Sequence, residues 1–384
     1  MSKWTECIIG DLCETISETY KGKDEEVVLI NTSDVLEGKV LNHKPVQNKK
    51  LKGQFKKTFK RNDILYSEIR PANKRFAFID FDATSNYIAS TKLMVLRHND
   101  KVLPEYLFAI LKSNYMLAKL QHLAETRSGT FPQITFSSEL APIKVRLPDK
   151  TTQKQIVSIL SSIEQKISVN CDINNNLEQQ AKAIYREMFV DNPSSEWKQG
   201  TLSDIADITM GQSPSGSSYN EESIGAVFFQ GRAEFGFRFP TVRLFTTEPK
   251  RMACANDILM SVRAPVGDLN VAYADCCIGR GLAAIHSKFK CQSFVLYTMF
   301  FLKKQLDVFN GEGTVFGSIN RKSLNEMPIL IPSDEKVDEF ERMVAPMDAA
   351  IRNNYDELCR LEQIRDSLLP KLMSGEIDVS NIEL

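Results

Sequence analysis

The sequence has little histidine, no metal-type cysteine pattern and no long hydrophobic run. It contains four histidines and eight cysteines in 384 residues, and no two cysteines form a C-x-x-C pair. Zinc sites need such residues at short spacings, so we expect none, and scattered thiols suit a reducing cytosol. The longest apolar-rich stretch, 294–302, is less than half of the about 20 residues that cross a bilayer. The amino terminus lacks the order of a signal peptide, so we expect a cytoplasmic protein without a membrane contact.

An excess of charge of one sign is also missing. The chain carries 48 Lys and Arg against 49 Asp and Glu, a net charge of -1. No global basic field attracts a nucleic acid, so polyanion binding requires local patches. Hydrophobic residues make up 42% and charged residues 25%, which is typical of a globular protein, and the length predicts two or three domains.

What the sequence does contain is an internal repeat. Trp4 recurs as Trp197, and 62–67 (Asn-Asp-Ile-Leu-Tyr-Ser) recurs as 256–261 (Asn-Asp-Ile-Leu-Met-Ser). Gly129-Thr130 recurs as Gly313-Thr314 in the same order. Matches in one order at a nearly constant offset indicate two copies of one module. The copies cover roughly 1–190 and 194–384, joined by a Pro- and Ser-containing linker.

Each copy ends in a long helix with a 3.5-residue apolar period. A strict period over more than four heptads predicts a coiled coil, although two amphipathic helices on separate cores remain an alternative. The predicted seam consists of Ile156, Leu160, Ile163, Ile167, Asn170, Leu177, Phe340, Val344, Met347, Ile351, Asn354, Leu358 and Leu361.

Two seam features carry further expectations. Asn170 and Asn354 share a seam position, and a buried seam Asn fixes register and pairing, so we expect them to face each other across the helix pair. Pro346 predicts that the second helix kinks or restarts there. Ahead of each helix, short β-type runs alternate with helical stretches such as 105–123, which predicts a mixed α and β module.

Patterns that could support catalysis are weak. Phe309-x-Gly311-x-Gly313 formally matches a loop that binds S-adenosylmethionine, but it follows a helix-like stretch instead of a strand. Pro148-Asp149 with Glu164-Gln165-Lys166 formally fits a nuclease carboxylate pattern, but solvated helix charges explain it better. No phosphate-binding loop with the Walker pattern is present. We therefore expect no active site in this chain.

Basic charge is unevenly distributed. Nine basic residues and no acidic one lie between Lys39 and Arg61, and arginines interleave with phenylalanines over 228–251. Clustered cations can neutralise successive phosphates, so both segments are candidates for DNA contact, with a solvated surface as the alternative.

Two modules on one template, each followed by a heptad helix, resemble the specificity (S) subunit of type I restriction–modification systems. The paired Trp, Asn-Asp-Ile-Leu and Gly-Thr segments carry the resemblance, together with the ending Leu-Leu-Pro-Lys-Leu-Met-Ser-Gly-Glu-Ile at 368–377. The resemblance implies an α+β (mixed) fold, in which two pseudo-two-fold related α/β target-recognition domains are separated by an antiparallel two-helix coiled coil. The implied segments are a first recognition domain at 1–149, a central spacer helix at 150–190, a linker at 191–196, a second recognition domain at 197–332, a C-terminal spacer helix at 333–375 and a tail at 376–384.

The resemblance also implies a division of labour. Each module would read one half of a split, asymmetric site on double-stranded DNA, and the chain would not be an enzyme on its own. Two methyltransferase (M) subunits would dock on it and bring S-adenosylmethionine, and restriction or motor (R) subunits would bring ATP and magnesium. The chain itself would bind no cofactor and no metal. A self-sufficient DNA methyltransferase and a coiled-coil assembly protein without DNA binding are the alternatives.

Residue type and placement suggest which side chains contact DNA, since Arg, Asn and Gln can pair with one base edge and Lys more often takes phosphate. Surface turns without a DNA role are the alternative at each position. In the first module the candidates are Lys49, Lys50, Lys56, Lys57, Arg70, Lys74, Arg75, Arg127, Thr130 and Gln133. In the second module they are Arg232, Arg238, Arg243, Arg263, Arg280, Thr314, Asn320 and Arg321.

Overall fold

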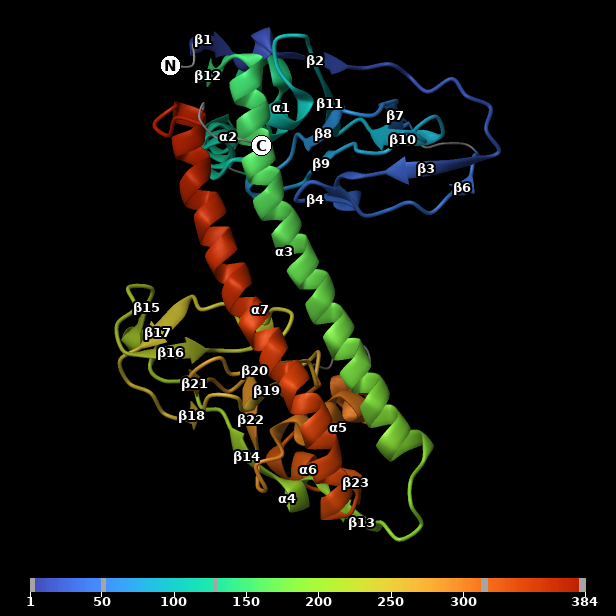
Figure 1. Cartoon of the computed structure of the whole chain (residues 1–384), viewed down its shortest axis with the longest axis vertical. Helices are drawn as coiled ribbons and strands as arrows, with labels where there is room; N and C mark the ends of the chain where they lie inside the picture. Colours follow the sequence, from blue (N-terminus) through green and yellow to red (C-terminus); the bar gives the residue numbers. More distant parts are fainter. Residues whose placement is uncertain (1–3, 50–52, 128–129, 312–316, 380–384) are drawn as a thin grey trace. The chain divides into compact units, whose positions relative to one another are not determined.

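The computed structural model describes residues 4–49, 53–127, 130–311 and 317–379 (Figure 1). These residues pack into two compact units. The first unit lies within 1–169 and 357–384, and the second within 170–356. The division falls inside two long helices, so each unit contains one globular region and part of each helix.

The two long helices are α3 (Lys150–Tyr185) and α7 (Asp334–Ser374). A π-helical turn at Arg186–Asp191 follows α3 directly. The predicted restart at Pro346 is wrong, because α7 is helical on both sides of it without a break. A proline removes one backbone hydrogen bond, and here the neighbouring turns and the packing of α7 keep the helix continuous.

Within each unit the two helices pair antiparallel. In the second unit, the ring centroids of Tyr185 and Phe340 lie 5.6 Å apart, and the Asn354 Nδ2 donates to Asn174 Oδ1 over 2.9 Å. In the first unit, Lys166 and Glu357 form an ion pair of 3.5 Å. Asn174, which accepts this bond, lies one turn further along α3 than Asn170, the residue predicted to face Asn354. Asn170 and Asn174 are both buried.

The predicted seam positions face inward in both units. Ile156, Leu160, Phe340, Val344 and Ile351 are buried. The remaining apolar seam positions are half-buried, namely Ile163, Ile167, Leu177, Met347, Leu358 and Leu361. Burial along the heptad positions confirms that the 3.5-residue period describes a helix–helix contact.

The first unit contains two four-stranded sheets. One is antiparallel, in the order β2 (Cys13–Ile16), β11 (Leu93–His98), β8 (Ile64–Ser67) and β9 (Phe76–Phe78). The other has the order β6 (Val46–Gln47), β3 (Glu26–Ile30), β10 (Tyr87–Ser90) and β7 (Phe55–Lys57), with β3 and β10 parallel. Two antiparallel pairs accompany them, β1 (Thr5–Ile8) with β12 (Lys144–Leu147) and β4 (Val35–Leu36) with β5 (Lys39–Val40).

The second unit repeats this arrangement. Its antiparallel sheet has the order β14 (Ala206–Met210), β22 (Leu282–Ser287), β19 (Ile258–Ser261) and β20 (Leu269–Val271). Its other sheet has the order β15 (Tyr219–Asn220), β17 (Leu244–Thr246), β16 (Ala226–Phe229), β21 (Cys276–Ile278) and β18 (Met252–Ala253), with β16 and β21 parallel. A further pair joins β13 (Lys198–Thr201) to β23 (Pro328–Ile331). Both units therefore share the four-stranded antiparallel sheet, a parallel strand pair in the other sheet and one flanking antiparallel pair, whereas the other sheet has four strands in the first unit and five in the second. The predicted mixed α and β fold is confirmed.

Helices cover one sheet in each unit. The first unit has α1 (Pro104–Lys112) and α2 (Asn114–Arg127), and the second has α4 (Leu202–Ile205), α5 (Gln292–Leu306) and α6 (Arg321–Asn325). The single helix predicted over 105–123 is wrong, because the chain is extended at Ser113. The Ser113 hydroxyl accepts the Met116 N–H over 3.2 Å and so begins a new helix.

The end of α7 packs beside the start of the chain. Gly375, at φ +76°, lies so close to the Trp4 ring that a Cβ there would be 2.7 Å from Trp4 Cε2. Arg146 donates to the Ser374 carbonyl over 2.6 Å and lies over the same ring. In the second unit, Trp197 packs against Phe189, at the end of α3, with ring centroids 5.7 Å apart. Each repeat therefore places its tryptophan at the end of a long helix.

Across the described ranges, no helix combines the length and the apolar character needed to cross a membrane.

Candidate nucleic-acid interface

The Asn-Asp-Ile-Leu segments build the frame of the site. Asn62 and Asn256 adopt left-handed φ angles of 69° and 73°, which Asn tolerates better than most residues. The carboxylate of the next residue, Asp63 or Asp257, accepts a backbone N–H three residues earlier over 2.8 Å. The strand that follows is buried at every position in both units. The repeated motif is thus a turn that starts a core strand.

At the other end of these strands, the same three backbone hydrogen bonds recur in both units. In the first unit they join Glu68 to Lys92, Ile134 to Glu68 and Arg70 to Pro132. In the second unit they join Val262 to Gly281, Ile319 to Val262 and Ala264 to Gly317. We call the loops held together in this way the loop edge of each unit. It brings residues distant in sequence into one surface.

Two predicted residues of the first unit, Arg70 and Gln133, lie on its loop edge, and a third lies near them in the chain. Arg70 is exposed at a left-handed φ of 45°, and Gln133 is half-buried in a β-bridge with Ile69. Thr130 is exposed and lies close by in the chain. An arginine and an amide on one exposed edge can make the paired hydrogen bonds that read a base edge.

The other predicted cations of the first loop edge are engaged within the protein. Lys74 forms an ion pair of 2.9 Å with Glu37, and Arg127 forms one of 3.0 Å with Glu139. Arg75 donates to the carbonyls of Ser33 and Val35 over 3.1 and 3.4 Å. Arg75 thus anchors the 33–35 turn through Nη1, and Lys74 and Arg127 remain half-exposed, so DNA contact by these three stays a prediction.

The basic run at 39–61 does not act as one group. Lys49 and Lys56 are exposed, and Lys50 lies outside the described residues. The Lys57 ammonium donates to the carbonyls of Thr91 and Leu93 over 3.1 and 2.8 Å, and burial lowers its pKa. Two of the three Lys57 donors are therefore used inside the sheet, which argues against the predicted phosphate contact.

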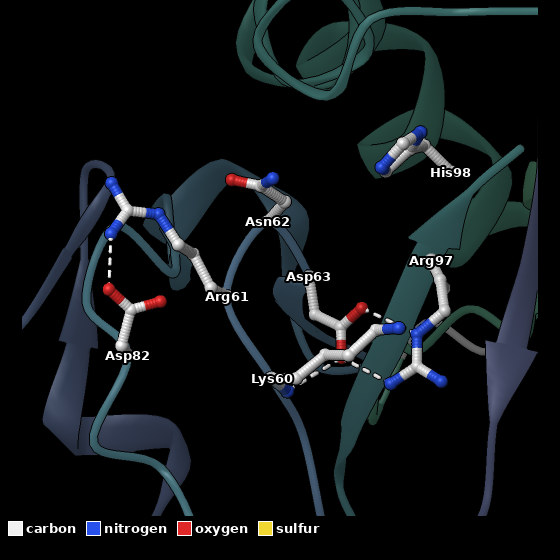
Figure 2. A pocket seen from close by; sticks show the side chains of 7 residues that line it. All are labelled: Lys60, Arg61, Asn62, Asp63, Asp82, Arg97 and His98. Carbon is white, nitrogen blue, oxygen red and sulfur yellow. Dashed lines mark hydrogen bonds and ion pairs between the residues drawn. The ribbon is translucent and has the colours of Figure 1, made fainter. Parts of the chain in front are cut away.

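A pocket of about 490 Å³ lies at the opposite strand ends of the first unit (Figure 2). Its lining is Lys60, Arg61, Asn62, Asp63, Asp82, Arg97 and His98. Arg97 makes a two-pronged contact of 2.8 and 2.7 Å with Asp63, and Arg61 lies 2.6 Å from Asp82. The hydrogen bond to Asp63 is the main cause of a raised Arg97 pKa. With both carboxylates neutralised, Lys60 leaves the pocket with net positive charge.

In the second unit, Arg263 and Arg280 are exposed on the loop edge. Arg232 pairs with Asp268 over 2.5 Å, and Arg243 pairs with Glu221 and Glu234 over 3.0 and 3.1 Å. Hydrogen bonds to Glu234 and Glu221 raise the Arg243 pKa, with the Glu234 bond the largest cause. Arg232 and Arg243 are half-exposed, so the structure leaves them at the surface but already paired.

One prediction for the second unit is wrong and one cannot be placed. Arg238 is buried, with its side chain 4% exposed, between two carboxylates. The Asn320 side-chain oxygen accepts the Ser323 N–H over 2.9 Å and so caps α6, while the side chain is exposed and its contact with DNA stays a prediction. Arg321 follows it and is exposed. Thr314 lies outside the described residues.

The structure adds two residues that sequence reasoning missed. Gln212 and Gln230 are exposed beside Arg280, because Gln212 N–H donates to Ile278 and Gly281 N–H donates to Gln230. Close approach at Gly211 permits this, since a Cβ there would be 2.1 Å from the Gly279 carbonyl oxygen. Gly211, Gly279 and Gly281 are the sequence signal that could have revealed the close approach of these segments.

The patterns that suggested catalysis have other surroundings. Phe309 and Gly311 follow α5 instead of a strand, and Gly313 lies outside the described residues. Glu164 pairs with Lys112, and Lys166 with Glu357. Among the described residues, no group of three or more His, Cys, Asp or Glu side chains is placed to hold a metal ion.

Comparison with known proteins adds an independent finding. The family described as "Type I restriction modification DNA specificity domain" matches residues 1–179 and 194–357. The type I restriction enzyme HindI specificity subunit of Haemophilus influenzae is 30% identical over 98% of this chain and 100% of its own. The putative type I restriction enzyme MjaX specificity subunit of Methanocaldococcus jannaschii is 31% identical over 83% of this chain and 79% of its own. The solved S subunit of a type I restriction–modification system from M. genitalium has a TM-score of 0.58 at 17% identity, covering 97% of this chain and 96% of its own, a likeness in fold.

Proposed function

Because this chain belongs to the type I restriction–modification DNA specificity family, and is therefore the non-catalytic DNA sequence-recognition subunit of such a system, we propose that its two units read two different halves of one split DNA site. The observation that carries the proposal is the repeated loop edge. Both units hold it by the same three backbone hydrogen bonds, but Arg70 and Gln133 of the first unit are replaced by Ala264 and Ser318 in the second. A common frame with different exposed side chains supports two half-sites of different sequence.

The proposed complex contains double-stranded DNA, two methyltransferase subunits and restriction or motor subunits. S-adenosylmethionine would be bound by the methyltransferase subunits, and ATP and magnesium by the restriction subunits. This chain contributes sequence recognition and a scaffold. Support comes from the family membership and from the paired helices, which present one side of each helix to the other and leave the remaining faces for partners.

We further propose that the helix pair sets the gap between the half-sites. From Ile156 to Met188 the chain has 33 residues, which corresponds to roughly 50 Å of helix and about 15 base pairs. Adding one heptad to each helix lengthens the rod by roughly 10 Å, or about three base pairs. A double insertion that leaves the preferred gap unchanged at full affinity would contradict this role.

Methylome sequencing of a host with and without this gene tests the main proposal. We expect one bipartite motif to lose methylation when the gene is absent. Exchange of residues from about 14 to 140 with those of another specificity subunit should change one half of that motif only. A motif whose two halves change together would contradict two independent readers, and an unchanged methylome would contradict the function itself.

A further inference from the structure

Arg238 is a buried cation that pairs with a carboxylate on each of the two long helices in the second unit. Its Nη1 donates to Asp348 Oδ1 on α7 over 2.9 Å, and its Nη2 donates to Glu178 Oε2 on α3 over 3.1 Å. Nη2 also lies 3.3 Å from the Tyr297 hydroxyl of α5. One guanidinium thus connects three helices with the loop that carries it.

The charges around Arg238 balance. Lys182 lies 2.5 Å from Glu178, and the Tyr297 hydroxyl donates to Asp348 over 2.9 Å. Burial acts to lower the pKa of Arg238, but its contacts with Tyr297, Asp348 and Glu178 outweigh burial, so its pKa stays above the ordinary value. The group therefore remains charged. A planar guanidinium presents several donors at fixed angles, which a lysine cannot do.

The loop from Gln230 to Arg243 joins β16 to β17, and hydrogen bonds from β20 hold its part at Gly236 and Arg238. The Asn270 side chain bonds the Gly236 backbone in both directions, over 3.2 and 2.9 Å. The Val271 N–H donates to the Arg238 carbonyl over 2.8 Å. Gln230 lies at the first end of this loop, on the loop edge. Arg238 therefore lies in a loop that is bonded to the helices by its side chain, to β20 by its backbone, and that begins at the exposed Gln230 of the loop edge.

The first unit attaches its globular region differently. In the repeat, Asp348 corresponds to Glu164 on α3. Glu164 forms its ion pair with Lys112 of α1. Lys112 is a single cation on a helix that already packs against α3, and it is 20% exposed. The matched carboxylates thus take different partners, a buried arginine from a loop in the second unit and a partly exposed lysine from a helix in the first. A buried ion pair is weak evidence for stability by itself, so the buried arginine calls for a role in geometry.

We propose that Arg238 is a positioning residue, which sets the orientation of the second recognition domain on the helix pair and hence the angle at which its loop edge meets DNA. The inference rests on the proposed function, in which the two units read half-sites separated by a gap. B-DNA turns once in about 10.5 base pairs, so one base pair added to the gap rotates the second half-site by roughly 34°. A domain held at one angle rejects that change, whereas a loosened domain tolerates it.

The experiment uses the full chain assembled with its methyltransferase partner. Equilibrium dissociation constants are measured for duplexes with the native gap, with one extra base pair and with one fewer. For Arg238→Met we expect the preference for the native gap to fall by about threefold or more, the scale of coupling between contacting groups. Base discrimination inside each half-site should remain unchanged, because the loop edge keeps its own side chains. Arg238→Lys should not restore the gap preference, since an ammonium cannot serve both carboxylates.

Matched variants separate positioning from folding. Arg342→Met removes an exposed arginine of α7 in the same unit and should keep the gap preference. If Arg238→Met does not fold, Asp348→Asn and Glu178→Gln decide the matter through the same measurement, since each removes one carboxylate charge, weakens one link to Arg238 and keeps side-chain shape. Folded variants that prefer the native gap as strongly as the unmodified chain, or full restoration by lysine, would overturn the inference. An unmodified complex without any gap preference would instead contradict the proposed function.

Discussion

The Asn354 side-chain amide donates to the Asn174 carbonyl over 2.9 Å, and this bond joins α7 to α3 inside the second unit. Asn174 is 3% exposed, so its amide has little access to water. A shift of helix register breaks this bond and leaves the buried Asn174 amide without this partner, so the bond favours one register.

Replacing Asn354 by Leu should destabilise the chain by about 1–3 kcal/mol, because a buried Asn174 amide loses its partner. The double variant Asn174→Leu/Asn354→Leu should regain most of this free energy of unfolding, since both polar groups are then gone. Urea unfolding of the two single variants and the double variant measures the coupling. Asn175→Leu, at an exposed position on the same helix, is the control, and a coupling near zero would show that the hydrogen bond does not hold the register.

The pair of Asp63 and Arg97 should contribute strongly to the first unit. Asp63 is 1% exposed, and Arg97→Met would leave its carboxylate with one backbone N–H, so we expect a loss of about 3 kcal/mol in the free energy of unfolding. Arg97→His copies the second unit, where His286 lies 2.6 Å from Asp257. Because a protonated imidazole is needed to replace the guanidinium, this variant should be more stable relative to Arg97→Met at pH 6 than at pH 8. Equal stability of the two variants at both pH values would argue against the ion pair.

The pocket at the strand ends of the first unit can be tested for phosphate contact. If Lys60 neutralises one DNA phosphate, Lys60→Ala should weaken binding to all sequences alike and reduce the slope of log affinity against log salt by about 0.9. The repeat supplies the control, because Cys254 occupies the corresponding position in the second unit and Cys254→Ala should leave the slope unchanged. A slope unaltered by Lys60→Ala, with assembly of the complex impaired, would assign the pocket to a protein partner.

Exposed side chains of the second loop edge should determine one half-site. Arg280→Ala should lose about 1–3 kcal/mol of discrimination at one base pair of that half-site and leave the other half-site unchanged. Binding to a panel of duplexes with single base-pair changes measures this. Arg186→Ala removes an exposed arginine near the end of α3 and should alter no base preference. Loss of discrimination in both half-sites would contradict separate reading.

The start of α3 should become less stable in acid. Asp149 accepts the Thr152 N–H over 2.9 Å, and this hydrogen bond lowers the Asp149 pKa. Because the folded pKa lies below the unfolded pKa, the stabilisation is present above the unfolded value and is lost as the pH falls through the folded one. Asp149→Ala should cost about 1 kcal/mol at pH 7. Asp149→Asn keeps an acceptor without titration, so its stability should change less between pH 7 and pH 3 than that of the unmodified chain, as unfolding curves at both pH values will show.

The sequence by itself determined the features that recur locally along the chain. The repeat of Trp, Asn-Asp-Ile-Leu and Gly-Thr segments predicted two copies of one module, and the 3.5-residue period predicted the inward faces of α3 and α7, because helix and strand periodicities depend on neighbours a few residues away. The left-handed turn at Asn62 and the strand after it follow from the same local chemistry. Family resemblance then gave the function.

Only the tertiary structure decided which charged groups remain available. In the sequence, Lys57, Arg75 and Arg238 cannot be told apart from Arg70 or Arg280, since all are basic residues in or beside loops. The fold directs Lys57 and Arg75 to backbone carbonyls and buries Arg238 between the carboxylates of Glu178 and Asp348, which lie far apart in the chain on two different helices. It likewise pairs Asn354 with Asn174, which the seam pattern did not single out. These choices depend on contacts between distant segments, and a buried cation or amide goes wherever the packed chain offers it an acceptor.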